Sequence, residues 1–196
     1  MRIILASRSP RRKELLSSLF SDFEIITADA DESLGDMTPK EGVRVLAERK
    51  GRALFDMQNI CGEELSQSLI ISSDTLVEKD GVPYGKPTDE EDAYRMLSSL
   101  SGSRHNVHTG VAVHYRGRVY SGVATTEVRF FDIADEEIRA YIATGEPMDK
   151  AGAYGIQGGA GRFVEGIDGD FDTVVGLSVK LTQTLVDEAL REGNSI

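Results

Sequence analysis

Residues 3–16, with the sequence IILASRSPRRKELL, predict a strand, a tight turn and a helix in direct succession. The apolar run Ile3–Leu5 is typical of a buried strand, and the polar residues that follow end this pattern. Ser9 is suited to cap the helix, and Pro10 fits the first helical position, where its missing N–H costs no hydrogen bond. The turn therefore brings free backbone N–H groups, two hydroxyls and three guanidinium groups to one place.

These groups favour a polyphosphate ligand. A helix N-terminus offers donors and partial positive charge, and arginine can pair with phosphate through two parallel hydrogen bonds. The alternative is a solvated basic turn, which is disfavoured because cations at a helix N-terminus oppose the helix dipole. The cluster also stands out in a chain whose formal net charge is -11.

Length and composition limit the class of protein. A chain of 196 residues predicts a single domain over residues 1–196, with room for two lobes around a central cleft. The single cysteine, Cys61, excludes an intramolecular disulfide and fits a reducing compartment. Neither a membrane-length apolar run nor a signal-peptide pattern is present, so we expect a cytoplasmic protein without a membrane partner. The 33 acidic residues against 22 basic ones argue against a nucleic-acid polymer as partner.

Hydrophobic periodicity predicts an α/β fold in which a mixed, twisted sheet with one long antiparallel hairpin is flanked by helices. The predicted strands after the first are residues 23–27, 69–73, the two arms of a hairpin over 105–131, and 163–167. The predicted helices are residues 10–20, a long one opening at Pro39, 88–100, 135–144 and 178–192, with a short element at 171–175. Loops are expected at residues 28–38, 62–68 and 145–161.

Polar residues stand where these strands are predicted to end. Asp74 and Thr75 follow the most apolar strand, and ligands of open α/β sheets bind at the carboxyl ends of strands. A lone aspartate there is more often a turn or cap residue. Here Lys86 follows just after the predicted Asp80-Gly81 hairpin turn, from which it can return toward Asp74. Glu32 lies in the acidic loop after the second strand.

The glycine-dense stretch 146–158, EPMDKAGAYGIQG, is a further candidate. Its glycines allow the backbone to approach a ligand closely, and it carries carboxylates, Lys150 and Gln157. A flexible linker is the alternative, but Tyr154 and Ile156 are apolar anchors that linkers lack.

The common alternatives for phosphate or acyl chemistry are absent from the sequence. No G-x-x-x-x-G-K-[ST] phosphate loop and no G-x-S-x-G nucleophile elbow occurs. His105, His108 and His114 lie on the hairpin, where satisfied or exposed histidines are more common than a zinc site. A cationic cluster with several carboxylates instead fits Mg²⁺ or Mn²⁺ bound between carboxylates and phosphates. These residues therefore indicate metal-assisted hydrolysis of a phosphoanhydride.

Several strings of the chain resemble the Maf family of nucleoside triphosphate pyrophosphatases over residues 2 to about 185. They are ASRSPRRKELL at 6–16, SSDTLV at 72–77, GKP at 85–87, EPMDKAGAYGIQG at 146–158 and DTVVGL at 172–177. The resemblance implies a fold of the inosine-triphosphatase type and a divalent metal. It also implies hydrolysis between the α and β phosphates, which would remove unwanted nucleotides from the pool. Its expected partners are a nucleoside triphosphate and, as an option, a second copy of the chain.

The resemblance also implies roles for single residues. Asp74 would activate water, with Glu32 near the metal and Glu146 or Asp149 as further candidates there; the implied metal ligands are Glu32 and Asp74. Ser7, Arg11 and Arg12 would bind the phosphates. Three lysines would add positive charge around them: Lys50, Lys86, which is also implied to be catalytic, and Lys150. The positions that separate the subfamilies are Arg11, Thr75 and Gln157, and they resemble the subfamily acting on dTTP and UTP. Alternatives are the same chemistry on other nucleotides, such as 7-methyl-GTP, or a nucleotide-binding regulator of septum formation.

Overall fold

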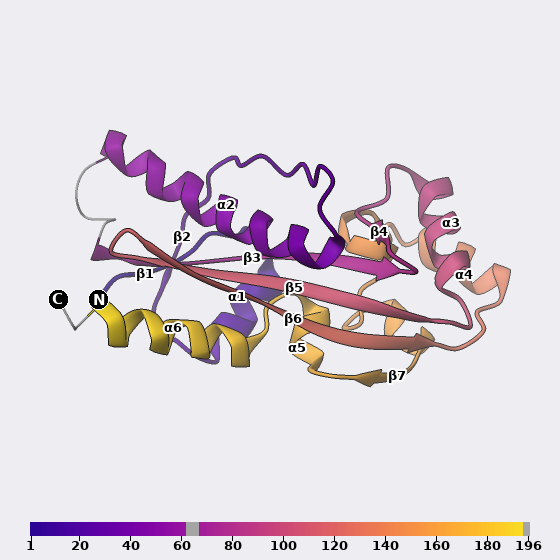
Figure 1. Cartoon of the computed structure of the whole chain (residues 1–196). Helices are drawn as coiled ribbons and strands as arrows, with labels where there is room; N and C mark the ends of the chain where they lie inside the picture. Colours follow the sequence, from indigo (N-terminus) through magenta and orange to yellow (C-terminus); the bar gives the residue numbers. More distant parts are fainter. Residues whose placement is uncertain (62–66, 194–196) are drawn as a thin grey trace. The chain divides into compact units, whose positions relative to one another are not determined.

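The predicted strands and helices follow one another along the chain in the predicted order, with one further strand over Val82–Tyr84, and the computed structural model has the predicted mixed α/β fold (Figure 1). The structure describes residues 1–61 and 67–193. The strands are β1 (Ile3–Leu5), β2 (Glu24–Ile25), β3 (Leu69–Lys79), β4 (Val82–Tyr84), β5 (Arg104–Tyr115), β6 (Arg118–Phe130) and β7 (Val164–Asp168). The α-helices are α1 (Pro10–Ser17), α2 (Pro39–Cys61), α3 (Glu90–Leu100), α4 (Asp135–Ile142), α5 (Phe171–Val175) and α6 (Val179–Gly193).

The sheet has the strand order β2-β1-β3-β5-β6-β7, with β4 added to β3. β1 pairs in parallel with both β2 and β3, whereas β4 pairs antiparallel with β3 and β7 antiparallel with β6. The turn of the long hairpin lies at Arg116 and Gly117, whose φ angles of 49° and 76° are left-handed. This geometry suits the twist of a two-residue hairpin.

The chain divides into two compact units. The first comprises Met1–Asp74, Thr109–Ala124 and Gly176–Ile196, and the second comprises Thr75–His108 and Thr125–Val175. Each unit has its own apolar core. The expectation of one domain with a central cleft stays a prediction.

In the first unit, helices cover both faces of the strands. Alternate residues of a strand point to opposite faces, so Leu5 and Ile71 face one way and Ile4 and Ile70 the other. The first pair packs with residues of α1 and α6, and the second pair packs with Leu54 of α2. Figure 1 shows α2 and α6 on opposite sides of the strands.

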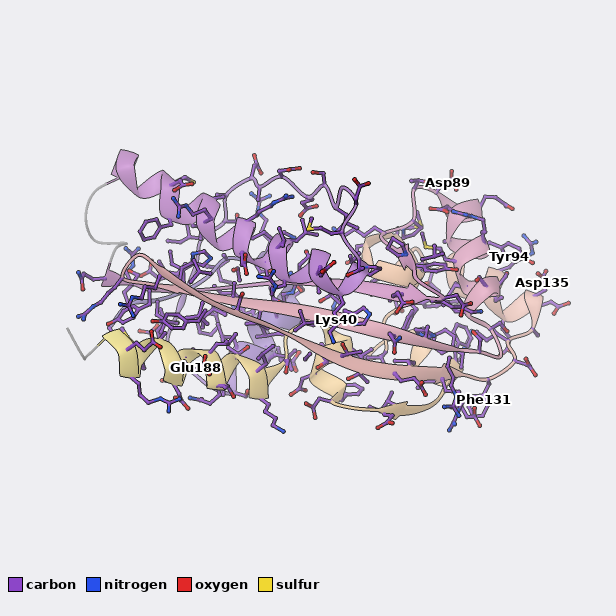
Figure 2. All side chains as sticks on the ribbon, in the orientation of Figure 1. Lys40, Asp89, Tyr94, Phe131, Asp135 and Glu188 are labelled. Carbon is purple, nitrogen blue, oxygen red and sulfur yellow. The ribbon has the colours of Figure 1, made fainter. Side chains whose placement is uncertain are left out.

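In the second unit, α3, α4 and the segment after α4 enclose the core. Buried Val107, Val128 and Phe130 of the strands pack with Leu97 and Tyr141 of these helices. Asp89 caps α3 by accepting a hydrogen bond from the Asp92 N–H at 2.8 Å. A hydrogen bond from Tyr94 to Asp135 joins α3 to α4; Figure 2 labels both residues and Asp89.

One prediction about an element needs correction, and another gains detail. The strand expected to end at Asp74 runs on to Lys79, because its antiparallel pairing with β4 extends it up to the Asp80-Gly81 turn. The loop expected over residues 145–161 contains the 3₁₀ helices η2 (Glu146–Asp149) and η3 (Ala151–Ala153) and most of η4 (Gly159–Phe163). Of the connection predicted at 62–68, residues 62–66 lie outside the described residues. No helix in the described ranges is both long and apolar enough to cross a bilayer.

Candidate active site

The turn between β1 and α1 forms as predicted and is held by its own hydroxyls. Ser9 caps α1, since its Oγ accepts from the Arg12 N–H at 3.5 Å. The buried Ser7 Oγ accepts from the Ser9 N–H at 3.2 Å and from Arg12 Nη1 at 3.4 Å. The Ala6 N–H donates to the carbonyl of Ile71 at 2.8 Å, which attaches the turn to β3. Two predicted phosphate-binding residues, Ser7 and Arg12, are thus in contact.

Arg12 also connects the turn to the segment that precedes α6. Its Nε donates to the carbonyl oxygen of Gly176 at 2.8 Å, and Ser73 Oγ donates to the same oxygen at 3.0 Å. Burial lowers the pKa of Arg12, the Asp74 and Glu32 carboxylates raise it, and the neighbouring Arg11 lowers it. The guanidinium stays charged at neutral pH, and two arginines and two carboxylates lie close enough to influence one another.

The alternation of β3 sends its polar residues to two different partners. Ser73 faces the Gly176 carbonyl, whereas Ser72 and Asp74 face the opposite way, toward α2. Ser72 Oγ donates to the Ala47 carbonyl at 2.7 Å, and this fixes the turn of α2 that carries Lys50. The ladder with β1 ends at Ile71 and the ladder with β4 begins at Val77, so Asp74 lies between two ladders.

Lys50 joins the two predicted catalytic carboxylates. Its Nζ lies 2.5 Å from Asp74 Oδ1 and 2.8 Å from Glu32 Oε1. The Lys50 and Asp74 side chains are 19% and 13% exposed, whereas the Glu32 side chain is 64% exposed. One ammonium group therefore holds a buried and an exposed carboxylate within reach of each other.

The loop that carries Glu32 is attached to α2 by its neighbours. Asp31 accepts hydrogen bonds from the backbone and hydroxyl of Ser33, at 3.0 and 2.9 Å. Arg49 Nη1 donates to the Ser33 carbonyl at 2.7 Å and lies 3.3 Å from Asp31 Oδ2. These contacts place Glu32 beside Lys50, which is the residue after Arg49.

The donors around Lys50 suit a hard divalent cation. Within residues 1–61 and 67–193, no three His, Cys, Asp or Glu side chains gather as a metal cluster. Mg²⁺ is commonly bound by only one or two carboxylates together with substrate phosphates and water. Glu32 and Asp74 supply two carboxylates beside a phosphate-type turn, so the residues present fit such an ion.

The other predicted site residues belong to the second unit. Thr75, the first residue of this unit, is half-buried, and Lys86 and Gln157 are exposed. Lys150 is bound within its own loop, where its Nζ donates to the Glu146 carbonyl at 2.7 Å and to Asp149 Oδ1 at 2.6 Å. The Gly152 N–H donates to the Gly85 carbonyl at 3.0 Å and so joins this loop to the residue before Lys86.

The three hairpin histidines lie on β5, most of whose residues are buried, and His108 is satisfied as expected, because its Nδ1 lies 2.8 Å from the Thr125 hydroxyl. All three are buried. His105 Nε2 lies 2.8 Å from the Tyr154 hydroxyl, but its Nδ1, like His114 Nε2, has no hydrogen-bond partner among the described residues. Burial lowers the pKa of each of these two histidines to about 4, so both are neutral at pH 7.

Some residues of the site could not be identified from the sequence. The carbonyl oxygen of Gly176 accepts hydrogen bonds from both Arg12 and Ser73, and no pattern of side chains in the sequence reveals this. Tyr141 lies on an ordinary amphipathic helix, yet its hydroxyl bonds to Glu146 at 3.0 Å. The only available signal was the placement of Gly176 just before a predicted helix.

Comparisons with known proteins identify the family of the chain. The family model described as "Maf-like protein" matches residues 2–189. The chain is 47% identical over 179 residues to a dTTP/UTP pyrophosphatase of Thermococcus gammatolerans, an alignment that covers 91% of this chain and 92% of that protein. It is 45% identical over 188 residues to a protein of the same name from Bacillus velezensis, covering 95% and 96%. A third protein of that name, from Pelotomaculum thermopropionicum, is 48% identical over 178 residues, covering 89% and 90%.

Proposed function

The chain belongs to the Maf family, and we propose from this membership that it hydrolyses dTTP and UTP to the monophosphate and pyrophosphate. The observation that carries the proposal is the contact of Lys50 with both Glu32 and Asp74, close to the arginines of the turn after β1. This set of charges suits a substrate that is itself an anion and that reacts at phosphorus.

In the proposed reaction, Asp74 accepts a proton from the attacking water. The oxygen of that water forms a bond to phosphorus, the bond to the bridging oxygen between the α and β phosphates breaks, and pyrophosphate leaves. Lys50 holds the Asp74 carboxylate in place at 2.5 Å. Ser7 and Arg11 bind phosphate oxygens, while Arg12 keeps the turn and the Gly176 segment together.

Glu32 and Asp74 would hold a divalent cation, Mg²⁺ or Mn²⁺. Bound there, it would neutralise phosphate charge and polarise the phosphate oxygens. Lys50 complements this role by keeping the two carboxylates together before substrate binds.

Base choice is assigned to Thr75 and Gln157, together with Arg11. The amide of Gln157 can pair with both O4 and N3–H of uracil or thymine, whereas cytosine reverses this donor and acceptor pattern. Lys86 and Lys150 complete the predicted cationic set. We further propose a cytoplasmic location, and a homodimer stays an option.

A nucleotide panel tests the proposal. Pyrophosphate release is measured from dTTP, UTP, CTP, GTP, ATP and 7-methyl-GTP with Mg²⁺ or Mn²⁺. An unpaired buried polar group costs about 1–3 kcal/mol, so dTTP and UTP should be preferred by at least about tenfold. Equal rates on CTP, GTP and UTP, or a preference for 7-methyl-GTP, would contradict the substrate assignment but leave the pyrophosphatase chemistry intact.

A further inference from the structure

We propose that Tyr141 and Glu146 are positioning residues that set the base preference by fixing the backbone on both sides of Gln157. The inference rests on the proposed function, in which Gln157 contacts the base. All of its contacts lie within the second unit.

Two hydrogen bonds bracket Gln157. The Gly155 N–H donates to the Tyr141 hydroxyl oxygen at 3.2 Å, and the Gly159 N–H donates to Glu146 Oε2 at 3.1 Å. The Tyr141 hydroxyl in turn donates to Glu146 Oε1 at 3.0 Å. The backbone two residues before Gln157 and two residues after it is therefore bound to one pair of side chains.

The glycines of this segment allow the pair to approach. A Cβ at Gly158 would lie 2.0 Å from Glu146 Oε1, and a Cβ at Gly155 would lie 2.7 Å from Lys150 Cε. The Gly158 N–H also donates to the Gly155 carbonyl at 3.0 Å, which closes a turn around Gln157. The segment is thus shaped to the Glu146 carboxylate.

Both side chains are themselves held in place. Tyr141 is 1% exposed, and its ring packs edge-on against Phe163 with ring centroids 5.5 Å apart. Burial raises the pKa of Tyr141 above its usual value, so its hydroxyl keeps the proton that it donates to Glu146. The backbone of Glu146 is fixed by Lys150 Nζ, which donates to its carbonyl at 2.7 Å.

This arrangement has a consequence for recognition. Gln157 is exposed and lies in a glycine-rich segment, which loses more conformational entropy on ordering than other sequences do. A backbone already fixed at both ends presents the amide in one place, so less of this entropy is lost when a base binds. Tyr141 and Glu146 therefore act on base preference without touching the substrate.

The test begins with Tyr141→Phe, which removes one hydroxyl and keeps the ring. Tyr120→Phe is the matched control, because Tyr120 also donates to a glutamate, Glu192, at 3.0 Å, but in the first unit. In Tyr141→Phe, we expect kcat/KM for UTP to fall about three- to tenfold because KM rises. The kcat/KM for CTP should change less than about twofold. Glu146→Gln should act in the same direction, because its amide nitrogen cannot accept a hydrogen bond.

A double-mutant cycle identifies the route of the effect. In a Gln157→Ala background, Tyr141→Phe should no longer change the ratio of UTP to CTP activity. A full effect in that background, or an unchanged ratio in both folded single variants, would overturn the inference while the wild-type preference for UTP stands. A wild-type enzyme without activity on dTTP or UTP would overturn the proposed function as well. Thermal unfolding of each variant shows that a changed ratio does not arise from loss of the fold.

Discussion

Lys50 shows how single residues determine the chemistry of this protein. Its ammonium group lies within 2.8 Å of the Glu32 and Asp74 carboxylates, which would otherwise repel each other and a polyphosphate substrate. Each like-charge contact costs about 1 kcal/mol or more at such separations. Lys50 alone cannot offset two carboxylates and the roughly four negative charges of a nucleoside triphosphate.

We therefore expect activity to depend on an added divalent cation. Pyrophosphate release from UTP should disappear in excess chelator and return when Mg²⁺ or Mn²⁺ is restored. Glu32→Gln should raise the metal concentration that gives half-maximal activity, whereas Glu192→Gln, an exposed residue on α6, should not. Full activity in excess chelator would contradict the metal-assisted reaction.

The sequence allowed some of these residues to be predicted and not others. Asp74 lies in one of the strings that resemble the family, Glu32 and Lys50 were predicted as charged residues that this resemblance implies, and the structure brings all three into contact. Ser73 and Arg12 both donate to the Gly176 carbonyl, and the Tyr141 hydroxyl accepts a hydrogen bond from the Gly155 N–H. Such contacts depend on where distant segments meet, and residue types alone do not encode this.

At the scale of elements, the apolar pattern predicts that a strand is present more reliably than it predicts the residue at which the strand ends. The apolar run predicts a strand over residues 69–73 that ends at Asp74 and Thr75, whereas β3 runs on through both residues to Lys79. The polar residues just before them fit in a buried strand because Ser72 and Ser73 donate to the Ala47 and Gly176 carbonyls, which satisfies their hydroxyls. Asp74 is therefore held on a strand interior, where its position is better defined than at a strand end.

The packing of α2 on the strands gives a prediction about this helix. Alanine normally stabilises a helix interior relative to glycine by about 1 kcal/mol. At Gly51, however, a Cβ would lie 2.3 Å from two atoms of the buried His114 ring and 2.8 Å from Ser72 Oγ. Gly51→Ala should therefore lower the free energy of unfolding, by about 1–3 kcal/mol, the usual cost of overpacking.

Gly42→Ala is the matched control for this prediction. Gly42 lies in the same helix, and its Cβ would meet only the side chain of Leu34, whose nearest atom is the terminal Cδ2. Its free energy of unfolding, measured in urea, should change less than that of Gly51→Ala. Equal effects of the two substitutions would contradict the close packing of Gly51 against His114.

At the scale of the whole molecule, each unit contains a buried histidine of low pKa. His114 lies in the first unit and His105 in the second. Burial is the largest cause for both; Lys79 lowers the pKa of His105 further, and Glu48 opposes the shift at His114. Both pKa values fall from 6.5 to about 4.

This makes the stability of the protein depend on pH in a defined window. Between pH 6.5 and about 4 the unfolded chain binds protons that the folded chain does not, so the free energy of unfolding falls as the pH falls. Across the whole window, each histidine lowers the free energy of unfolding by roughly 3 kcal/mol. Urea midpoints measured at pH 7.5, 6.0 and 5.0 should decrease in that order, and a midpoint that stays constant would contradict the burial of neutral histidines.

The central claim is that Asp74 activates water for cleavage between the α and β phosphates. The most direct measurement is the rate and identity of the products formed from UTP by the wild type, Asp74→Asn and Asp187→Asn, an exposed control on α6. The wild type and the control should each form one pyrophosphate for every UMP. The Asp74→Asn variant should form these products about 10²–10⁴-fold more slowly, with unchanged thermal unfolding. Formation of UDP and phosphate, or an Asp74→Asn rate close to that of the wild type, would contradict the claim.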